Sequence, residues 1–297
     1  MRIATFVHEG QRRVGQVAVD GQSVTAFALD AAQAARGALP LIEAAAQGAA
    51  LPALTGPAMA LNSVRLEAPL PLPRRNLWCV GRNYHEHAKE LQASVFKDNN
   101  ANPATWPIVF TKVPECVVAT GTDVLLPGDD ISPQIDYEAE LAVVIGRTVP
   151  RHTKEADALQ YVFGYSCFND MSVRDYQKRT PQWTIGKNFD GTGAFGPVLV
   201  TADELPPGAV GLKIQGRLNG AVMQDANTSD MIFNVAETIA LLAEVLTLEP
   251  GDVIAMGTPA GVGQARTPPV WMKAGDTYEV AIEGIGTLVN PIVNEAA

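Results

Sequence analysis

The chain has 297 residues, 47% of them apolar and 18% charged, which fits a globular protein and excludes a disordered or fibrous one. A net charge of −10 excludes the global basic footprint of a nucleic-acid-binding protein, so any anion must be bound by a local cluster of Lys and Arg. The three cysteines share no CxxC spacing, which favours a reducing compartment. We expect a cytoplasmic protein with no membrane partner, because the sequence contains neither a signal-peptide core nor about 20 consecutive apolar residues.

The first 70 residues predict a small α+β domain. Residues 1–25 alternate apolar and polar side chains, which predicts two or three short strands. Residues 28–48 have a helical pattern with one break. The proline-rich stretch that follows predicts an extended linker. We therefore expect two domains, 1–70 and 71–297.

The rest of the chain is dominated by strand patterns separated by Gly turns. Predicted strands lie at 77–80, 141–146, 198–201, 211–220, 252–257, 277–286 and 287–293. Predicted helices lie at 84–91, 153–162 and 234–247. The intervening stretch 92–106 has no clear period, which is typical of a long functional loop such as a lid. Because a βαβ rhythm is missing, the predicted fold class is a strand-rich α+β fold, a curled or sandwiched sheet with helices outside.

The first motif with chemical potential is acidic. In IDYEAELAVVIG, period-2 geometry places Asp136, Glu138 and Glu140 on one face of a strand, with the Cα atoms of the two glutamates about 6.6 Å apart. A solvated outer face is the alternative. The same face continues through Ala142 and Val144, however, and buried like charges are costly unless a cation neutralises them. Carboxylate ligands suit Mg²⁺ or Mn²⁺, with Ca²⁺ as a less specific surrogate.

A second motif, NDMSVRDYQ, supplies another carboxylate. If a helical turn starts here, Asp170, Arg174 and Gln177 share one face. The alternative is an N-capping Asp170 in an ion pair with Arg174. Next to the acidic strand, Asp170 becomes a candidate third metal ligand.

A third motif, GRNYHEHAKE, contains two of the four histidines. His87 and Glu90 are three residues apart, so a helix presents them as neighbours. A carboxylate in that position can orient an imidazole that acts as a general base. The alternative is a polar surface helix, and spacing alone favours it. A zinc site using His85 and His87 is weakly supported, because those two side chains face different ways on a helix.

The segment from Gly191 to Gly196 matches GxGxxG but does not predict a dinucleotide site. That fingerprint needs a strand before it and a helix after it, whereas Pro197 and a predicted strand follow here. We interpret these glycines as a turn. Lys187, just before them, is a candidate cation near an anion site.

Eight segments in order carry a family resemblance: GRNYHEHAKE, PIVFTKVP, IDYEAELAVVIG, NDMSVRDYQ, GKNFDGTGAFGP, NTSDMIFNVAETI, GDVIAMGTPAGVG and MKAGDTYEVAIEGIGTLVN. From about residue 76 to 294 the chain resembles the fumarylacetoacetate hydrolase family. The resemblance implies a mixed β-sandwich or roll with peripheral helices and, usually, a homodimer.

The resemblance also implies roles for individual residues. It implies that Glu138, Glu140 and Asp170 hold Mg²⁺ or Mn²⁺, that His87 with Glu90 activates water, and that Lys187 stabilises a substrate enolate. The loop at 91–106 is implied to close as a lid. The implied substrate contacts are Arg82, Tyr84, Arg174, Gln177 and Thr258.

The expected activity is hydrolysis of the C3–C4 bond of a 2,4-dioxo acid, an acylpyruvate, to pyruvate and a carboxylic acid. The metal and Lys187 stabilise the enolate that forms. Decarboxylation, isomerisation or hydration of a small 2-oxo acid at the same site is the first alternative, since all pass through an enolate. The second is a non-catalytic protein that binds a 2-oxo acid, which the His87–Glu90 pair and Lys187 disfavour.

Overall fold

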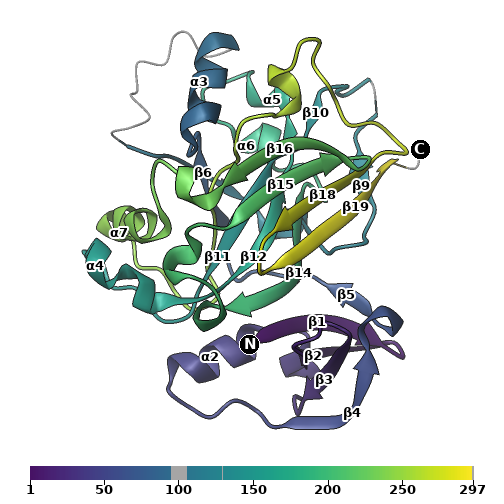
Figure 1. Cartoon of the computed structure of the whole chain (residues 1–297), viewed down its shortest axis with the longest axis vertical. Helices are drawn as coiled ribbons and strands as arrows, with labels where there is room; N and C mark the ends of the chain where they lie inside the picture. Colours follow the sequence, from purple (N-terminus) through teal and green to yellow (C-terminus); the bar gives the residue numbers. More distant parts are fainter. Residues whose placement is uncertain (95–105, 129, 296–297) are drawn as a thin grey trace.

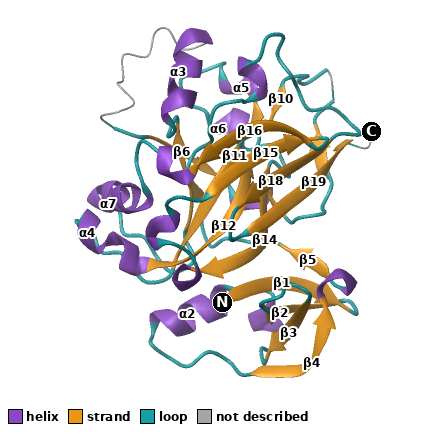
Figure 2. Ribbon diagram, in the orientation of Figure 1, coloured by secondary structure: helices purple, strands orange, loops and turns teal. Residues whose placement is uncertain are grey.

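The computed structural model describes residues 1–94, 106–128 and 130–295. Two β-sheets form most of the molecule, and helices lie around them (Figures 1 and 2). The larger sheet, 12-stranded within the described residues, has a main path in this spatial order: β4 (Leu54–Ala60), β3 (Ser23–Phe27), β2 (Gln11–Val17), β1 (Arg2–His8), β14 (Gly193–Thr201), β12 (Val162–Asp170), β11 (Ala139–Ile145), β17 (Val253–Ala255), β6 (Leu77–Gly81) and β7 (Ile108–Lys112). Two short strands pair off this path, β5 (Arg65–Glu67) with β1 and β8 (Val117–Val118) with β14.

The smaller sheet supplies the second layer of the fold. Its order is β16 (Ala221–Asn227), β15 (Lys213–Leu218), β18 (Thr277–Ile282), β19 (Gly286–Asn294) and β9 (Val124–Leu126). A two-stranded pair joins β10 (Ile135–Asp136) and β13 (Ser172–Val173). The helices are α1 (Ala31–Ala34), α2 (Leu39–Ala46), α3 (His85–Ser94), α4 (Glu155–Ala158), α5 (Arg174–Gln177), α6 (Thr184–Lys187) and α7 (Val235–Val245). The predicted strand-rich α+β class is confirmed.

The sequence predicted that the proline-rich stretch after residue 50 is an extended linker, but the structure shows more than a linker there. Part of it forms β4 and β5, which pair with β3 and β1. Pro57 is tolerated in β4 because β4 is an edge strand. Proline has no N–H to donate, and on the open side of an edge strand no neighbouring strand needs that donor. Its side chains are mostly exposed, which explains why the sequence carries no apolar alternation there.

The first 70 residues share a sheet and a core with the rest of the chain. β1 pairs antiparallel with β14, with Ile3 opposite Leu199. One apolar cluster contains Ile3 and Leu41 from this part together with Val144 and Phe168 from the central strands. A boundary near residue 70 stays a prediction, and this shared cluster makes cooperative unfolding the expected behaviour.

Replacing Leu41 by alanine should lower the free energy of unfolding of the whole chain by about 2–5 kcal/mol, because Leu41 is completely buried in the shared cluster. Leu54→Ala is the matched control, since that leucine is about half exposed, and it should cost under about 1 kcal/mol. Denaturant unfolding monitored by fluorescence and circular dichroism measures both. Two separate transitions, of which Leu41→Ala moves only one, would contradict the shared core.

Strand β11 positions the acidic residues at the centre of the large sheet. It is buried on both faces: Leu141 and Val143 belong to the main core, and Ala142 and Val144 to the shared cluster. The apolar continuation of the glutamate face is therefore confirmed. The strand does not run unbroken from Asp136, however, because β10 ends there and β11 begins at Ala139.

Two predicted helices are also confirmed. Helix α7 begins with a capping box in which Asn234 accepts from the N–H of Glu237, and the Glu237 carboxylate accepts from the N–H of Asn234. Helix α3 extends to Ser94, further than predicted. Residues 95–105 of the predicted lid lie outside the described residues. No helix within the described ranges is long and apolar enough to cross a membrane.

Candidate active site

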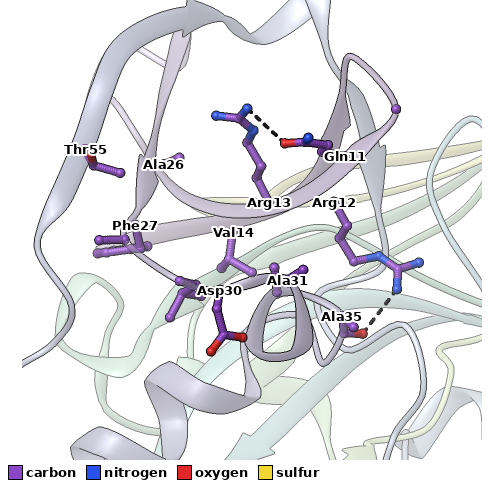
Figure 3. A pocket seen from close by; sticks show the side chains of 14 residues that line it. Gln11, Arg12, Arg13, Val14, Ala26, Phe27, Asp30, Ala31, Ala35 and Thr55 are labelled. Carbon is purple, nitrogen blue, oxygen red and sulfur yellow. Dashed lines mark hydrogen bonds between the residues drawn. The ribbon is translucent and has the colours of Figure 1, made fainter.

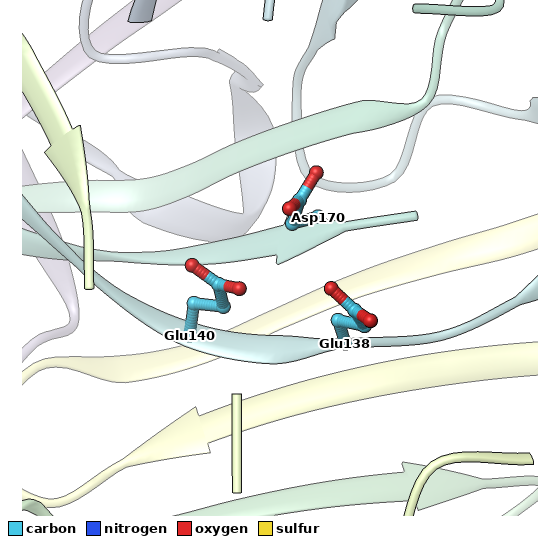
Figure 4. A group of neighbouring side chains, drawn as sticks. All are labelled: Glu138, Glu140 and Asp170. Carbon is cyan, nitrogen blue, oxygen red and sulfur yellow. The ribbon is translucent and has the colours of Figure 1, made fainter. Parts of the chain in front are cut away.

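Three carboxylates meet where β11 and β12 lie side by side. Glu138 and Glu140 come from β11 and the residues leading into it, and Asp170 ends β12 (Figure 4). The strands pair with Ala139 opposite Asn169, and the Asp170 N–H donates to the Glu138 carbonyl at 3.0 Å. Carboxylate oxygens of all three lie within 4.8 Å of one another, and all three side chains are buried. The predicted grouping of Glu138, Glu140 and Asp170 is thus what the fold produces.

Asp170 reaches the cluster from a strand, not from the helical turn that the sequence suggested. It is the last residue of β12, and the turn of α5 begins only at Arg174. Arg174 forms its ion pairs with Asp136 at 2.8 Å and Glu138 at 2.6 Å. Its Nη1 also donates to Gln177 Oε1 at 3.0 Å. The alternative Asp170–Arg174 helical ion pair is therefore wrong, because the chain is extended between the two residues.

Two lysines are buried against the same carboxylates. Lys187 Nζ lies 2.7 Å from Glu138 Oε2 and 2.6 Å from Asp170 Oδ2. Lys112, completely buried, lies 3.1 Å from Asp170 Oδ1, and its Nζ also donates to the backbone carbonyls of Met171 and Lys187. Lys112 thus holds both a candidate ligand and the segment that carries Lys187.

The surrounding charges shift the pKa values of Glu138 and Glu140 in opposite directions. Burial would raise the pKa of Glu138, but Lys187, Arg174 and His87 outweigh it and lower that pKa to about 2. Burial and the charges of Asp170 and Glu138 raise the pKa of Glu140 well above its usual value. Glu140 accepts the Gly257 N–H at 2.9 Å and has no ion pair among the described residues. It is the carboxylate whose ionisation calls for a further cation.

A divalent metal fits this donor set. Glu138, Glu140 and Asp170 supply only oxygen, which hard cations such as Mg²⁺ and Mn²⁺ prefer. The buried Glu140 carboxylate is the observation that most needs such an ion, because a buried charge without a partner is strongly unfavourable. These three residues would hold the metal.

The stabilisation of the protein by Mn²⁺ should grow as pH rises. A carboxyl whose folded pKa is raised holds more protons folded than unfolded, so Glu140 makes the metal-free protein less stable as pH climbs above about 4.5. A bound cation favours the ionised form and removes this loss. Glu138, with its lowered pKa, acts only below that window. Thermal unfolding from pH 5.5 to 8.5, with and without Mn²⁺, measures the difference. A Tm gain that is constant or shrinks with pH would contradict it.

The predicted pair of His87 and Glu90 forms on helix α3. His87 Nδ1 lies 3.1 Å from Glu90 Oε2, and the imidazole is buried. A carboxylate can only accept, so Nδ1 carries the proton and Nε2 is the basic nitrogen. The Gly261 N–H donates to both Glu90 oxygens, at 3.1 and 3.3 Å. Glu90 is therefore held from two sides, unlike a residue of a polar surface helix.

The loop around Thr258 connects these two groups. Its Gly257 N–H binds Glu140 and its Gly261 N–H binds Glu90, so one short segment contacts both the carboxylate cluster and the histidine pair. Thr258, which lies between Gly257 and Gly261 in the chain, is buried and lines the small cavity described next. Gly257 has φ +89°, and a Cβ there would lie 2.7 Å from the Val80 carbonyl, so only glycine fits this turn.

One small cavity of about 20 Å³, roughly the room of a single water, is where these groups converge. Its described lining comprises Val80, Gly81, Arg82, His87, Phe110, Glu138, Glu140, Arg174, Gln177, Trp183, Lys187, Thr258 and Gln264. Of the predicted substrate contacts, Tyr84 is the exception. Its side chain is 1% exposed, belongs to the main core and does not line this cavity, and its buried hydroxyl has no hydrogen-bond partner among the described residues, so its contact with substrate stays a prediction.

Sequence reasoning missed several residues of the site. Lys112 carried one signal, a single charge two residues after the apolar run PIVF. Gln264 lines the cavity, and its buried Oε1 has no hydrogen-bond partner in the described part of the chain. No spacing rule could connect it to the acidic strand, because it lies on a short 3-10 helix, Gly263–Ala265, far along the chain from that strand.

A larger cavity of about 550 Å³ lies elsewhere, between β2, β3 and α1 in the first 35 residues and Thr55 (Figure 3). Arg12 and Arg13 are at its edge, but Arg12 donates to the Ala35 carbonyl and Arg13 contacts Gln11. Much of the remaining lining is alanine. His87, Lys187, Glu138 and Glu140 line the small cavity and not this one.

Comparison with known proteins identifies the family. The family model for the fumarylacetoacetate hydrolase C-terminal domain matches residues 76–293. The oxaloacetate tautomerase YisK of Bacillus subtilis is 44% identical over 232 residues, covering 78% of this chain and 74% of that protein. The human mitochondrial oxaloacetate tautomerase FAHD2A is 40% identical over 239 residues, covering 80% of this chain and 72% of that protein.

Solved structures agree with the fold. A fumarylacetoacetate hydrolase from Exiguobacterium antarcticum has a TM-score of 0.82 at 35% identity, over 99% of this chain and all of that one. The maleylpyruvate hydrolase of Sphingobium sp. SYK-6, solved with manganese(II) and pyruvate, has a TM-score of 0.74 at 30% identity over the full length of both chains.

The fold and the site together define the class of this protein. It is an enzyme that acts on small substrates, and its buried acidic cluster suits a divalent metal. The chain belongs to the fumarylacetoacetate hydrolase family. The predicted family is confirmed. The similar curated proteins are named tautomerases, however, so the hydrolase activity stays a prediction.

Proposed function

We propose that this protein is a metal-dependent oxaloacetate tautomerase, which interconverts the enol and keto forms of a small 2-oxo acid. One arrangement supports this above all: a buried imidazole, a buried ammonium and two carboxylates, those of Glu138 and Glu140, line the same small cavity, and the third carboxylate, Asp170, lies against that ammonium. The names of the relatives at 44% and 40% identity support oxaloacetate as the substrate.

The residues of this chain suit proton transfer next to a carbonyl. His87 Nε2, kept basic by the Nδ1 contact with Glu90, takes the proton from C3 of the keto form and returns it in the reverse direction. The Lys187 ammonium stabilises the negative charge that develops on the 2-oxo oxygen. Solvent supplies the proton that converts this oxygen into the enol hydroxyl, and protonated His87 releases its own proton to solvent; the reverse direction runs through the same transfers. Hydrogen-bond donors for the two carboxylates of the substrate come from Arg82, Arg174, Gln177 and Thr258.

A divalent cation at Glu138, Glu140 and Asp170 would supply Lewis-acid polarisation of the 2-oxo group, worth several kcal/mol. We propose Mn²⁺ or Mg²⁺, with Ca²⁺ as a surrogate. Lys187 competes for the same carboxylate oxygens, at 2.6 and 2.7 Å. The ion would therefore share the carboxylates of Glu138 and Asp170 with this ammonium.

Hydrolysis of an acylpyruvate is the second candidate. The same His87–Glu90 pair is placed to take a proton from water, which would attack C4 and release pyruvate enolate and a carboxylic acid. The maleylpyruvate hydrolase at 30% identity supports this reading. The names of the relatives at 44% and 40% identity favour oxaloacetate over an acylpyruvate.

A substrate panel separates the candidates. Purified protein with Mn²⁺ or Mg²⁺ is mixed with enol oxaloacetate, acylpyruvates and unsaturated 2-oxo dioates, and enol absorbance, pyruvate and CO₂ are measured. Loss of oxaloacetate enol without pyruvate or CO₂ is the expected result. Pyruvate from acylpyruvates would favour the hydrolase, and CO₂ a decarboxylase. No turnover with any of them would favour a non-catalytic 2-oxo acid-binding protein.

We also propose a homodimer in the cytoplasm. Membership of the family supports the dimer, and the cysteine pattern supports a reducing compartment. Size-exclusion chromatography with light scattering should give twice the mass of the chain.

A further inference from the structure

We propose that Gln224 is a positioning residue that fixes the Thr258 hydroxyl as a hydrogen-bond donor directed into the cavity, toward a carboxylate oxygen of the substrate. This rests on the proposed function only in that the substrate carries a carboxylate. Gln224 lies on β16 in the small sheet, is 1% exposed, and does not itself line the cavity.

Every hydrogen-bonding position of the Gln224 amide is used. Its Oε1 accepts from the Ala139 N–H at 3.0 Å and from the Tyr278 hydroxyl at 2.7 Å. Its Nε2 donates to Thr258 Oγ1 at 2.7 Å and to the Pro259 carbonyl at 2.8 Å. A glutamine has two N–H donors and two acceptor lone pairs, so this set is complete.

Two backbone groups force the orientation of that amide. The Ala139 N–H can only donate, so it requires Oε1 on its side, and the Pro259 carbonyl can only accept, so it requires Nε2 on the other. Burial keeps the pKa of Tyr278 above its usual value, so its hydroxyl remains protonated and donates to the same oxygen. A flipped amide would lose the bonds to both the Ala139 N–H and the Pro259 carbonyl.

The consequence falls on Thr258. Its oxygen accepts from Gln224 Nε2, so its own proton must point to a different acceptor. Thr258 is buried and lines the cavity beside Arg82 and Lys187. The hydroxyl therefore offers that cavity a donor, which favours a carboxylate oxygen over any group that only donates.

The Gln224 amide also connects strand β11, next to the candidate metal ligands, with the loop that contains Thr258. Ala139 lies between Glu138 and Glu140, so Gln224 ties the candidate ligands on β11 to Thr258 across the two sheets. Space for this network depends on Gly216 of β15. A Cβ there would lie 2.1 Å from the Tyr278 hydroxyl and 2.8 Å from Gln224 Oε1.

The test uses Gln224→Glu, which keeps the shape but replaces the two N–H donors by an acceptor, so that the Thr258 proton turns away from the cavity. We expect oxalate, a planar dicarboxylate probe, to bind the Mn²⁺-loaded variant roughly 10- to 100-fold more weakly than the wild type by calorimetry, the range for a hydrogen bond to a charged group. Thr258→Val should have a similar effect, and Thr258→Ser should retain binding.

A double-mutant cycle distinguishes positioning from general damage. If Gln224 acts through Thr258, adding Gln224→Glu to Thr258→Val should weaken oxalate binding less than about 3-fold further. Gln215→Glu, a buried glutamine on β15 that contacts Arg217, is the matched control and should bind oxalate like the wild type. Independent, additive losses, or unchanged binding by a folded Gln224→Glu protein, would overturn the proposal.

Oxalate binding needs no turnover, so the two proposals fail separately. A wild-type protein that binds oxalate, shows this cycle and yet leaves enol oxaloacetate unchanged supports the role of Gln224 and refutes the tautomerase. A Mn²⁺-loaded wild type that does not bind oxalate overturns the role of Thr258 as a carboxylate donor, and with it the role of Gln224.

Discussion

The Glu140→Gln protein should have no metal-dependent activity and yet, without metal, be more stable than the wild type. Glu140 is buried, its pKa is raised by burial and by Asp170 and Glu138, and it has no ion pair among the described residues. Glutamine keeps an oxygen for the Gly257 N–H and removes the buried charge. We expect the Tm of the metal-free protein to rise by a few degrees at pH 8.

Activity should move in the opposite direction. Losing one of three carboxylate ligands removes Lewis-acid stabilisation worth several kcal/mol, so kcat/KM should fall by about 10³-fold or more, and Mn²⁺ should no longer raise the Tm. Glu279→Gln on β18, outside the cluster, is the control and should change neither. A Glu140→Gln protein that is less stable without metal, or that still responds to Mn²⁺, would show that Glu140 is a structural residue and not a ligand.

The Glu90→Ala protein should lose about 10²- to 10⁴-fold in kcat, the usual contribution of general-base catalysis, while its affinity for Mn²⁺ changes less than about 3-fold. Glu90 contacts His87 Nδ1 and the Gly261 N–H but no carboxylate of the cluster. Without it, the imidazole loses the group that fixes its tautomer.

Glu86→Ala is the matched control for this second substitution. Glu86 lies on the same helix, is largely exposed and pairs with Lys89, so its removal should leave kcat within about 2-fold. Mn²⁺ titration followed by steady-state kinetics measures both properties. Normal turnover by Glu90→Ala would remove His87 from the role of base, and a parallel loss of metal affinity would indicate general disruption of the site.

Local sequence patterns were sufficient for much of this site. Period-2 spacing placed Glu138 and Glu140 on one face, and helical spacing placed His87 beside Glu90, because both relations depend only on regular backbone geometry. The strand-rich fold class followed from short apolar runs separated by glycine turns.

Patterns failed where the chain is irregular or the contact is distant. Asp170 was assigned to a helical turn because Arg174 and Gln177 follow at helical spacing, but the segment is extended until Arg174. The proline-rich stretch after residue 50 contains β4, an edge strand with little apolar alternation. Gln224 on β16 binds Thr258, 34 residues away in the loop after β17, and local spacing carries no information about such a pair.

The charges of the site show why the acidic motif could not be interpreted alone. A strand with two nearby glutamates is compatible with a solvated surface until their surroundings are known. In the structure the glutamates are buried, and the two lysines and Arg174 form ion pairs with Glu138 and Asp170. Glu140 has no such ion pair among the described residues. The unbalanced carboxylate is the feature that links the fold to metal-dependent chemistry.

Metal dependence of the tautomerase is tested most directly by the rate at which the protein removes enol oxaloacetate, measured for one sample after chelation and again after Mn²⁺ is restored. We expect chelation to abolish the catalysed rate and Mn²⁺ or Mg²⁺ to restore it, and we expect the Glu140→Gln protein to have no such rate under either condition. A catalysed rate that is undiminished in the chelated protein would contradict this metal dependence.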